Sequence, residues 1–270
     1  MPPLDDALDL MRGRRIAVLT GAGISTESGI PDYRGPKTRH RARNPILGRQ
    51  FVDNAAMRRR YWARSLLGWP RIADAQPNAA HHALVDLERA GLSTGLITQN
   101  VDSLHTRAGS RDVVALHGRM ADVRCLSCDA RFGRRWLQEA LQDANPGWFR
   151  EVELAPDGDA ELDTTEGFTV IDCPRCKGIL KPDVVFFGEG VPRPRVDKAF
   201  AIVDAAEVLL VVGSSLAVFS GFRFPRHMHR RGLPVVLLNL GPTRADGMAT
   251  LKINESAGRF LPRLVTRLIP

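Results

Sequence analysis

Four cysteines at metal-ligand spacing are the strongest chemical signal in this sequence. They form two Cys-x-x-Cys pairs, Cys125 with Cys128 and Cys173 with Cys176, and there is no fifth cysteine. Two pairs of soft thiolates are the ligand set of a closed tetrahedral zinc site, which leaves no open position for water. The pairs therefore predict a structural Zn²⁺, although the 44 residues between them exceed the usual gap of about 15–20. Reduced core cysteines or a redox role are the alternative.

A glycine-rich segment, GAGIS (21–25), has the composition of a phosphate-binding loop. It directly follows the apolar run 14–20, which predicts a buried strand. Small residues let the backbone approach a phosphate closely, and a helix that begins here would offer unpaired N–H groups to the anion. A turn that needs glycine only for its backbone geometry is the alternative. Thr26 replaces the third glycine of the dinucleotide fingerprint and no acidic ribose ligand stands out near position 40, so we do not predict a standard Rossmann dehydrogenase.

Amides, a carboxylate and imidazoles follow two further apolar runs. Gln99, Asn100 and Asp102 come after the run that begins at residue 95, and His117 ends the run that begins at residue 113. An imidazole at an exposed strand end is suited to general-base catalysis near neutral pH. A lone histidine is more often structural, and we assign that role to His81, His82, His105, His227 and His229.

Alternating apolar runs and amphipathic segments indicate the scaffold that positions these residues. Six apolar runs each stop at a polar residue or glycine: 14–20, 95–100, 113–118, 183–189, 207–215 and 233–241. Continuous hydrophobicity predicts parallel strands covered on both faces, and segments 78–91 and 196–206 predict helices between them. The chain is therefore expected to form an α/β fold with a doubly wound parallel sheet, whose ligands bind at the carboxyl ends of the strands.

Two segments interrupt this alternation. Residues 119–178 hold both cysteine pairs and a helical pattern at 136–144, and they predict a small zinc-binding domain. Residues 36–74 predict a partly helical insertion, which leaves 1–35, 75–118 and 179–270 for the large domain. Between residues 34 and 64 the sequence has ten Lys or Arg and one acid, whereas the whole chain has a net charge of +8. Such a segment attracts acidic ligands or nucleic acid, or is merely a solvated face.

Composition excludes several classes of protein. With 44% hydrophobic and 25% charged residues the chain is neither disordered nor fibrous. No apolar run approaches the roughly 20 residues that span a bilayer, and the acidic start, MPPLDDALDL, predicts no secretory signal. We therefore expect a cytoplasmic protein that does not bind membranes, and in such a reducing compartment disulfides are disfavoured, which favours metal ligation by the cysteines.

The motifs together resemble the sirtuin family, NAD-dependent protein deacylases. The resemblance rests on GAGISTESGIPDYRG (21–35), TQNVDSLHTRAG (98–109), LHG (116–118), KPDVVFFGE (181–189), GSS (213–215) and the paired cysteines, which occur in the family's order. Segments RYWARSLLGWP (60–70), APDGD (155–159) and LNLGPTR (238–244) are similar to the class II branch, which includes a mitochondrial lipoamidase and ADP-ribosyltransferase. The resemblance implies a Rossmann-like domain, a small zinc domain and an active-site cleft between them.

The same resemblance implies where NAD is held. The cofactor residues are Gly21, Ala22, Gly23, Ser25, Asp32, Tyr33, Arg34, Gln99, Asn100, Asp102, Gly213, Ser214, Ser215, Asn239, Gly241 and Ala257. The loop at 21–25 and Arg34 would hold the phosphates and ribose, whereas Asp32 and Asp102 would line the nicotinamide pocket. The segment 213–215 and Asn239 would hold the adenosine half, with the backbone at Ala257 against adenine. Tyr33 stands where other branches have Phe, as in class II.

The resemblance also implies the reaction and its substrate. Asn100 would orient the ribose and a water, and His117 would accept a proton from the ribose hydroxyls, giving free lysine, nicotinamide and O-acyl-ADP-ribose. An acylated lysine peptide would add as a strand between Gly188-Glu189 and Val218-Phe219, beside Val185 and Phe186. Tyr61 and Arg64 are similar to the pair that binds acidic acyl groups, because Arg can grip a carboxylate with two hydrogen bonds. The alternative is that Tyr61 and Trp62 pack a helix and Arg64 is solvated.

Two rival functions remain open from the sequence. Mono-ADP-ribosyl transfer to protein would use the same NAD site with another acceptor. A zinc-ribbon protein that binds nucleic acid would account for the positive charge and the cysteines, but it leaves Asn100, Asp102 and His117 without a role, so we rank it last. We expect a monomer.

Overall fold

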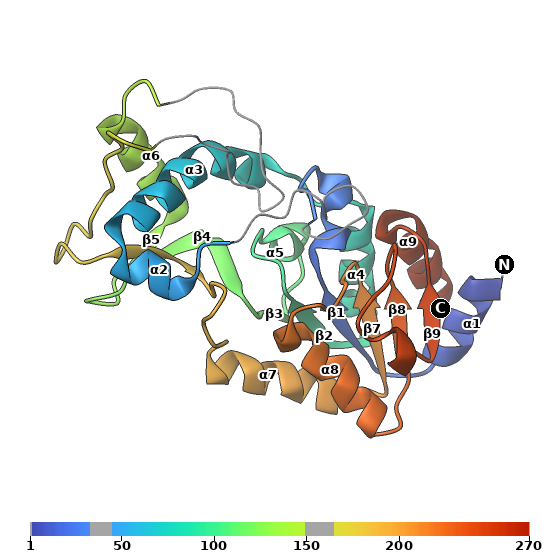
Figure 1. Ribbon diagram of the computed structural model, residues 1–270. Helices are drawn as coiled ribbons and strands as arrows, with labels where there is room; N and C mark the ends of the chain where they lie inside the picture. Colours follow the sequence, from blue (N-terminus) through green and yellow to red (C-terminus); the bar gives the residue numbers. More distant parts are fainter. Residues whose placement is uncertain (1, 33–44, 149–164, 270) are drawn as a thin grey trace.

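The structure is a computed structural model that describes residues 2–32, 45–148 and 165–269, and Figure 1 shows its two lobes. The helices are α1 (Pro2–Met11), α2 (Gly48–Asp53), α3 (Ala55–Asp74), α4 (Ala79–Arg89), α5 (Leu104–Ala108), α6 (Arg134–Ala144), α7 (Arg193–Asp204), α8 (Phe219–Arg230) and α9 (Ala257–Leu268). The strands are β1 (Ile16–Thr20), β2 (Ser93–Thr98), β3 (Val113–Ala115), β4 (Gly118–Cys125), β5 (Arg131–Gly133), β6 (Leu180–Val184), β7 (Val208–Val212), β8 (Val235–Leu238) and β9 (Leu251–Ile253).

A six-stranded parallel sheet forms the large lobe, as the continuous apolar runs predicted. Its order is β3-β2-β1-β7-β8-β9, so the chain turns in opposite directions on the two sides of the β1–β7 pair. This is the topological switch point of a doubly wound sheet, where ligands bind beyond the carboxyl ends of the strands. All five residues of β1 and of β7 are buried, because helices cover both faces of the sheet.

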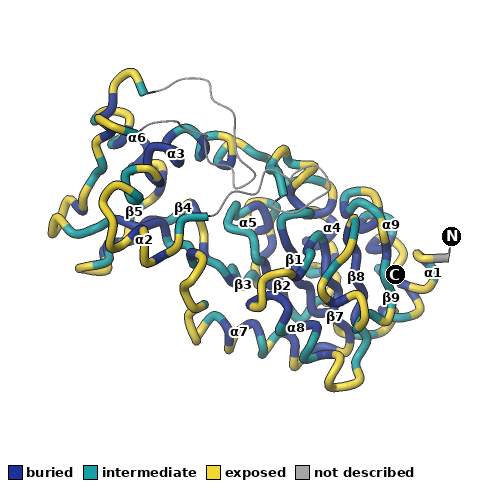
Figure 2. Tube along the Cα trace, viewed as in Figure 1, coloured by how far each residue is buried: buried dark blue, intermediate teal, exposed yellow. Residues whose placement is uncertain are grey.

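Alternate residues of β1 enter two separate cores. Ile16 and Val18 pack with α1, α4 and α9 on one face of the sheet. Ala17 and Leu19 pack with α7 and α8 on the other face, since successive side chains of a strand point to opposite sides. The central strands β1, β7 and β8 are accordingly buried along their length (Figure 2).

The small lobe combines both predicted insertions. Its three-stranded sheet has the order β5-β4-β6, and α2, α3 and α6 pack against it. One hydrophobic cluster joins Phe51 and Trp62 of the first insertion to Val123, Leu137 and Cys173 of the second. Asn54 begins α3 by accepting N–H groups from the first turn, a typical N-cap.

Two expectations about the elements are wrong. The run 183–189 is not a strand of the parallel sheet: β6 ends at Val184 and pairs antiparallel with β4 in the small lobe. The sixth parallel strand is instead β9, a three-residue segment that has no long apolar run. Helix α4 matches the prediction for 78–91, with Asn78 as its cap and Gly91 in the left-handed region after it. In the described part of the chain, no helix combines the length and apolarity needed to cross a bilayer.

Candidate active site

The ends of the parallel strands lie in register along one edge of the sheet. Thr20 at the end of β1 pairs with Thr98 of β2 and with Val212 of β7. The polar residues that follow these strands therefore meet at the same edge, although they are separated by up to about two hundred residues in sequence. This edge brings together the segments 21–25, 98–102 and 213–215.

The glycine loop after β1 packs directly on the turn after β7. Gly21 N–H donates to Val212 O at 3.0 Å, and Gly23 N–H donates to Gly213 O at 2.8 Å. A Cβ atom on Gly23 would lie 2.8 Å from Gly213 Cα, and Gly213 itself has a φ of +60°, so each position requires glycine. The loop continues as two short 3₁₀ turns, η1 (Ala22–Ile24) and η2 (Thr26–Ser28), rather than the expected α-helix. The loop lies at the switch point where a doubly wound sheet binds dinucleotides, and its glycines keep the backbone close to the turn after β7, so the residues present fit NAD.

Asn100 and Asp102 are tied to this loop through Ser25. Asn100 Nδ2 donates to Gly21 O and to Ser25 Oγ, both at 3.1 Å. Ser25 Oγ in turn donates to Asp102 Oδ2 at 2.7 Å, and Leu104 N–H donates to Asp102 Oδ1 at 2.9 Å. Burial raises the pKa of Asp102, and the hydrogen bonds from Leu104, Ser25 and Asn100 oppose that rise. The amide and the carboxylate are therefore preoriented at the strand ends.

His117 is half-buried and both its ring nitrogens have partners. Nδ1 lies 2.9 Å from Gln99 O, and because a carbonyl only accepts, Nδ1 carries the proton in the neutral ring. Nε2 then accepts a hydrogen bond from Ser220 Oγ at 2.7 Å. Burial lowers the pKa of His117, the bond to Gln99 raises it, and the charges of Arg195 and Arg223 lower it further. A neutral imidazole with its lone pair on Nε2 is a competent general base.

Gln99 and Ser214 connect the imidazole to the switch point. The Gln99 side-chain amide donates to Ser214 Oγ at 2.8 Å and to Thr20 O at 3.3 Å. A Cβ on Gly221 would collide with the Gln99 side chain, so α8 can pack closely only because glycine is there. The backbone that orients His117 is consequently fixed from β1, β7 and α8 together.

The remaining predicted cofactor residues lie at the ends of β7, β8 and the start of α9. Asn239 is buried, and its Nδ2 donates to Leu240 O at 3.0 Å and to Gly241 O at 3.3 Å. Gly241 has a φ of +85°, and Ala257 is buried as the first residue of α9. Ser215 O accepts the N–H of Arg244 at 2.9 Å. Asp32 is half-buried, whereas Tyr33 and Arg34 lie outside the described residues.

The four cysteines converge in the small lobe. All four Sγ atoms lie within 4.8 Å of one another, with Cys125 and Cys176 separated by 3.5 Å and Cys128 and Cys173 by 3.8 Å. Ligands of a tetrahedral zinc ion with Zn–S bonds of about 2.3 Å lie about 3.8 Å apart, so the thiols fit Zn²⁺. Their position against the lobe core indicates a structural ion.

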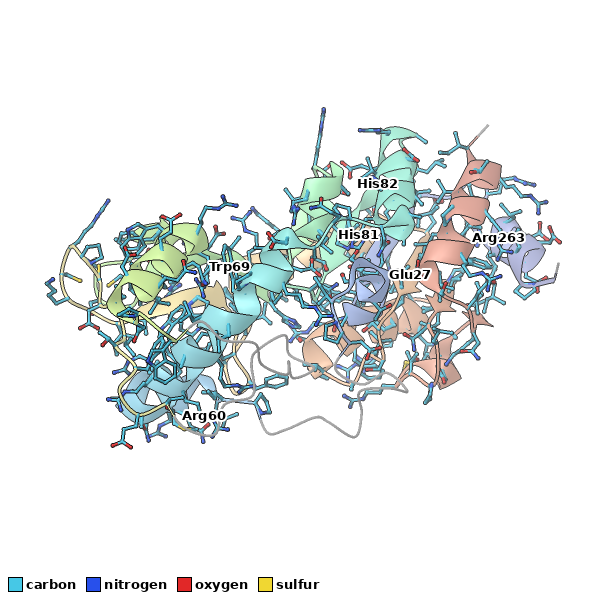
Figure 3. The ribbon with its side chains drawn as sticks, turned by 90° about the horizontal axis from the view of Figure 1, so that it is seen from above. Glu27, Arg60, Trp69, His81, His82 and Arg263 are labelled. Atoms are coloured by element: carbon cyan, nitrogen blue, oxygen red, sulfur yellow. The ribbon has the colours of Figure 1, made fainter. Side chains whose placement is uncertain are left out.

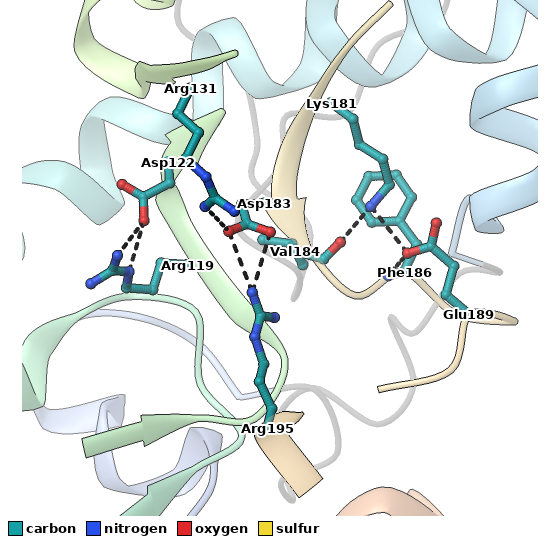
Figure 4. A network of polar contacts seen from close by, with 9 residues as sticks. All are labelled: Arg119, Asp122, Arg131, Lys181, Asp183, Val184, Phe186, Glu189 and Arg195. Atoms are coloured by element: carbon teal, nitrogen blue, oxygen red, sulfur yellow. Dashed lines mark hydrogen bonds and ion pairs between the residues drawn. The ribbon is translucent and has the colours of Figure 1, made fainter. Parts of the chain in front are cut away.

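The predicted peptide-binding segment after β6 is fixed by a buried lysine. Lys181 is 6% exposed, and its Nζ donates to Val184 O and to Glu189 Oε2, which lies 3.0 Å away (Figure 4). The same carboxylate oxygen accepts the Phe186 N–H at 2.8 Å. Val185 N–H donates to His117 O at 2.8 Å, which ties this segment to the backbone of the predicted general base. Gly188 has a φ of +83°, a left-handed turn that glycine adopts without strain.

Tyr61 and Arg64 lie on α3, and both are 8% exposed. The Tyr61 ring packs on Phe186 with centroids 5.2 Å apart, so the helix adjoins the peptide-binding segment. The alternative that Arg64 is solvated is wrong, because its side chain is buried in the small lobe. Phe51, Tyr61, Trp62 and Phe186 form an aromatic cluster with centroid separations of 5.1–6.2 Å.

Sequence reasoning missed two residues of the site. Ser220 bonds the base nitrogen of His117, but no motif marks a serine in the first turn of α8. Lys181 belongs to the motif at 181–189, but nothing in that motif indicates that the side chain is buried and fixes the segment that follows β6. Of the histidines assigned structural roles, His105 is buried and bonds Thr20 Oγ1 at 2.9 Å, and His227 pairs with Asp204 at 2.7 Å.

Comparison with known proteins shows which family shares this sequence and this arrangement. The profile of the Sir2 family matches residues 21–220. The chain is 50% identical over 267 residues to NAD-dependent protein deacetylase 1 of Mycobacterium avium, covering 97% of this chain and 94% of that protein. It is 49% identical over 278 residues to the mitochondrial NAD-dependent protein lipoamidase sirtuin-4 of Bos taurus, covering 98% and 88%.

Solved structures agree with these relatives. The structure described as Sir2-p53 peptide-NAD+ has a TM-score of 0.81 and 32% identity, and the likeness covers 98% of both chains. Another, described as Sir2 bound to acetylated peptide, has a TM-score of 0.79 and 30% identity over 98% of both chains. The matched profile spans the glycine loop, the histidine and all four cysteines, and this chain therefore belongs to the Sir2 family, the sirtuins.

Proposed function

We propose that this protein is an NAD-dependent protein lysine deacylase that releases free lysine, nicotinamide and O-acyl-ADP-ribose. Its relatives at 50% and 54% identity, from Mycobacterium avium and Xanthomonas axonopodis, are NAD-dependent protein deacetylases. The structure described as Sir2-p53 peptide-NAD+ pairs the same fold with a peptide and NAD. These relatives favour deacylation over the rival, ADP-ribosyl transfer to protein.

One observation carries the proposal. His117 is held with its proton on Nδ1 by Gln99 O, and the Gln99 side chain is bonded to Ser214 at the cofactor edge. The base nitrogen Nε2 therefore belongs to a fixed strand end beside the glycine cradle. A general base must be within hydrogen-bond reach of its proton donor, and a rigid backbone anchor satisfies that demand.

Each residue has a defined role in this proposal. The backbone of 21–25 and Gly213 would bind the pyrophosphate, and Asn100 and Asp102 would orient the ribose and the nicotinamide end. Bound NAD supplies an ADP-ribosyl group that accepts the acyl oxygen as nicotinamide leaves. His117 takes the ribose hydroxyl proton at Nε2, which requires Ser220 Oγ to yield its hydrogen bond. The four thiolates would hold Zn²⁺ away from this chemistry, as a structural ion.

The acyl preference is a finer part of the proposal. We assign the chain to the class II branch because 60–70 and 238–244 resemble that branch and because the bovine lipoamidase is 49% identical. Arg64 is buried three residues after Tyr61, whose ring contacts Phe186 of the peptide-binding segment. A buried guanidinium is suited to grip a carboxylate on a longer acyl chain. Four unbridged thiols support a cytoplasmic location for the enzyme.

The test is NAD-dependent nicotinamide release with acetyl-, succinyl-, glutaryl- and lipoyl-lysine peptides. We expect release with at least one peptide, and loss of about 10²-fold or more in kcat/KM for His117→Tyr with melting temperature and zinc content unchanged. Arg64→Ala is expected to lower turnover of the acidic acyl groups selectively, whereas Arg60→Ala, on the exposed face of the same helix, should not (Figure 3).

Two results would contradict these assignments. If nicotinamide release were accompanied by attachment of labelled ADP-ribose to protein, with every peptide left acylated, the activity would be ADP-ribosyl transfer and not deacylation. Unchanged acyl ratios in Arg64→Ala would remove the carboxylate assignment and leave the deacylase intact.

A further inference from the structure

The first turn of α8 presents an apolar pair beside the catalytic imidazole. Val218 is 37% exposed and Phe219 is 46% exposed, and both precede Ser220, whose hydroxyl bonds His117. Large apolar side chains left exposed next to a reactive group are suited to contact a bound partner. What surrounds this pair therefore bears on which substrates can enter.

Two arginines lie against Phe219 and a third lies against Phe222 on the same helix, and we call the three the arginine rim. Arg223 and Arg226 lie over the Phe219 ring, with guanidinium carbons 5.4 and 5.1 Å from its centroid. Arg244 lies 4.3 Å over Phe222, one helical turn along. Cation–π contacts of this kind hold a guanidinium in place while leaving its N–H groups available to an anion.

The rim carries charge that is not neutralised. Among the described residues, no carboxylate pairs with Arg223, Arg226 or Arg244, and the sequence of α8 contains no acid. The Nε of Arg223 is buried and has no hydrogen-bond partner in the described part of the chain. A buried donor without an acceptor costs free energy, so a ligand that supplies an acceptor there gains affinity.

Several neighbouring cations differ from the rim because they have an acidic partner. Arg195 pairs with Asp183 at 3.3 Å, and Lys181 pairs with Glu189 at 3.0 Å (Figure 4). At the far end of α8, Arg231 pairs with Asp204 at 3.3 Å. Of the rim arginines, Arg223 lies close enough to His117 for its charge to lower the pKa of that imidazole.

We propose that the arginine rim selects acyl-lysine peptides that carry acidic side chains next to the modified lysine. This inference rests on the proposed deacylase function, because it names the peptide class that reaches His117. An acidic peptide fits better than nucleic acid, since the three cations lie over two phenylalanines of one helix rather than forming the extended phosphate-contact surface that duplex binding requires. Aspartate or glutamate would accept hydrogen bonds from Arg223 or Arg226 while an apolar neighbour covers Phe219.

The test uses three acetyl-lysine peptides that are identical except for Glu, Gln or Lys at the positions flanking the acetyl-lysine. We expect kcat/KM to fall in that order, with Glu about fivefold above Gln at low ionic strength and a smaller ratio in high salt. Arg223→Gln with Arg226→Gln should bring the Glu to Gln ratio to about one. Arg230→Gln, an exposed arginine on the same helix farther from His117, is the matched control and should keep the ratio.

Melting temperatures verify that the variants are folded. If the double variant does not fold because it lacks Arg223, the single variant Arg226→Gln is used in its place. Peptide affinities measured by calorimetry test the rim proposal independently of turnover. A wild-type chain that deacylates no peptide would therefore refute the proposed function and not the rim proposal. Unchanged Glu to Gln ratios in the rim variants, in turnover and in affinity, would overturn the rim proposal. Loss of DNA affinity in the same variants with unchanged peptide ratios would also overturn it.

Discussion

At the scale of single residues, the site depends on which nitrogen of His117 carries its proton. Gln99 O fixes the proton on Nδ1, and Ser220 Oγ donates to Nε2 at 2.7 Å. The second bond stabilises the neutral ring, in the same direction as burial, which lowers the pKa. Ser220 is thus a positioning residue that keeps the base unprotonated until a substrate replaces it.

This arrangement predicts the pH dependence of turnover. General-base catalysis needs neutral His117, so kcat/KM falls as pH drops through the pKa of His117, which burial holds below 6.5. The acidic limb is therefore expected below pH 6.5. Ser220→Ala removes the donor to Nε2 and should move that limb to higher pH, as measured from kcat/KM profiles. A limb that moves to lower pH in Ser220→Ala would contradict the assigned tautomer.

At the scale of elements, α4 has one histidine on each face. His81 is fully buried, with its ring centroid 4.8 Å from that of His105 on α5, and His82 is exposed. Figure 3 labels both histidines on this helix. Burial lowers the pKa of His81 to about 4, with a smaller contribution from the charge of His82. Packing of the apolar face of α4 on the sheet is what imposes this burial.

The buried face of α4 predicts a loss of stability in acid. A histidine whose folded pKa lies below its unfolded value binds fewer protons when folded, so the free energy of unfolding decreases as pH falls from 6.5 towards about 4. From His81 alone the decrease between pH 7.5 and pH 5 is on the order of 2 kcal/mol. Urea denaturation at the two pH values should show it, and His81→Gln should reduce the difference between them.

His82→Gln is the matched control because it changes the same residue type one position away on the exposed face. It should retain nearly the whole pH dependence. If His81→Gln and His82→Gln lost the same amount, the titrating group would not be the buried histidine.

At the scale of the whole molecule, one small sheet connects the cysteine cluster to the predicted peptide-binding segment. Strand β4 begins at Gly118, next to His117, and ends at Cys125. Its partner β6 pairs Leu180 with Cys125 and Val184 with Gly118, so it runs from the cysteine cluster to the peptide-binding segment 185–189. The cysteine-bearing end of the lobe therefore sets the position of residues that adjoin His117.

Loss of the metal should consequently affect peptide binding more than NAD binding. Cys128→Ser removes one thiolate at an exposed position, and we expect loss of zinc, a lower melting temperature and a large rise in KM for the acyl peptide. Calorimetry should show NAD affinity nearly unchanged, because the glycine cradle belongs to β1 and β7. Ser127→Ala keeps all four thiolates and is expected to retain zinc. Equal losses of NAD and peptide affinity in Cys128→Ser would refute this separation of roles.

Local patterns determined most of the large lobe and the chemistry of the site. Runs such as 14–20 and 207–215 are continuous and apolar because their strands are buried on both faces, and the Cys-x-x-Cys spacing reflects the geometry of a chelate. Strand β9 was not predicted because a segment of three residues is too short to show a hydrophobic pattern. The run 183–189 misled because its apolar residues do not belong to a buried strand: β6 ends at Val184, Phe186 is buried and Phe187 is 42% exposed.

The tertiary structure decided what no local pattern encodes, namely which distant groups meet. The hydrogen bond from Ser220 to His117 joins residues 103 positions apart. The arginine rim is completed by Arg244, which comes from outside α8 and packs on Phe222 of that helix, and α8 itself contains no acid. The two insertions share one core, since Trp62 of the first and Cys173 of the second are both buried in the same hydrophobic cluster. Residue types fix which chemistry a chain can perform, whereas burial, tautomer and uncompensated charge arise only when the strand ends are brought together in space.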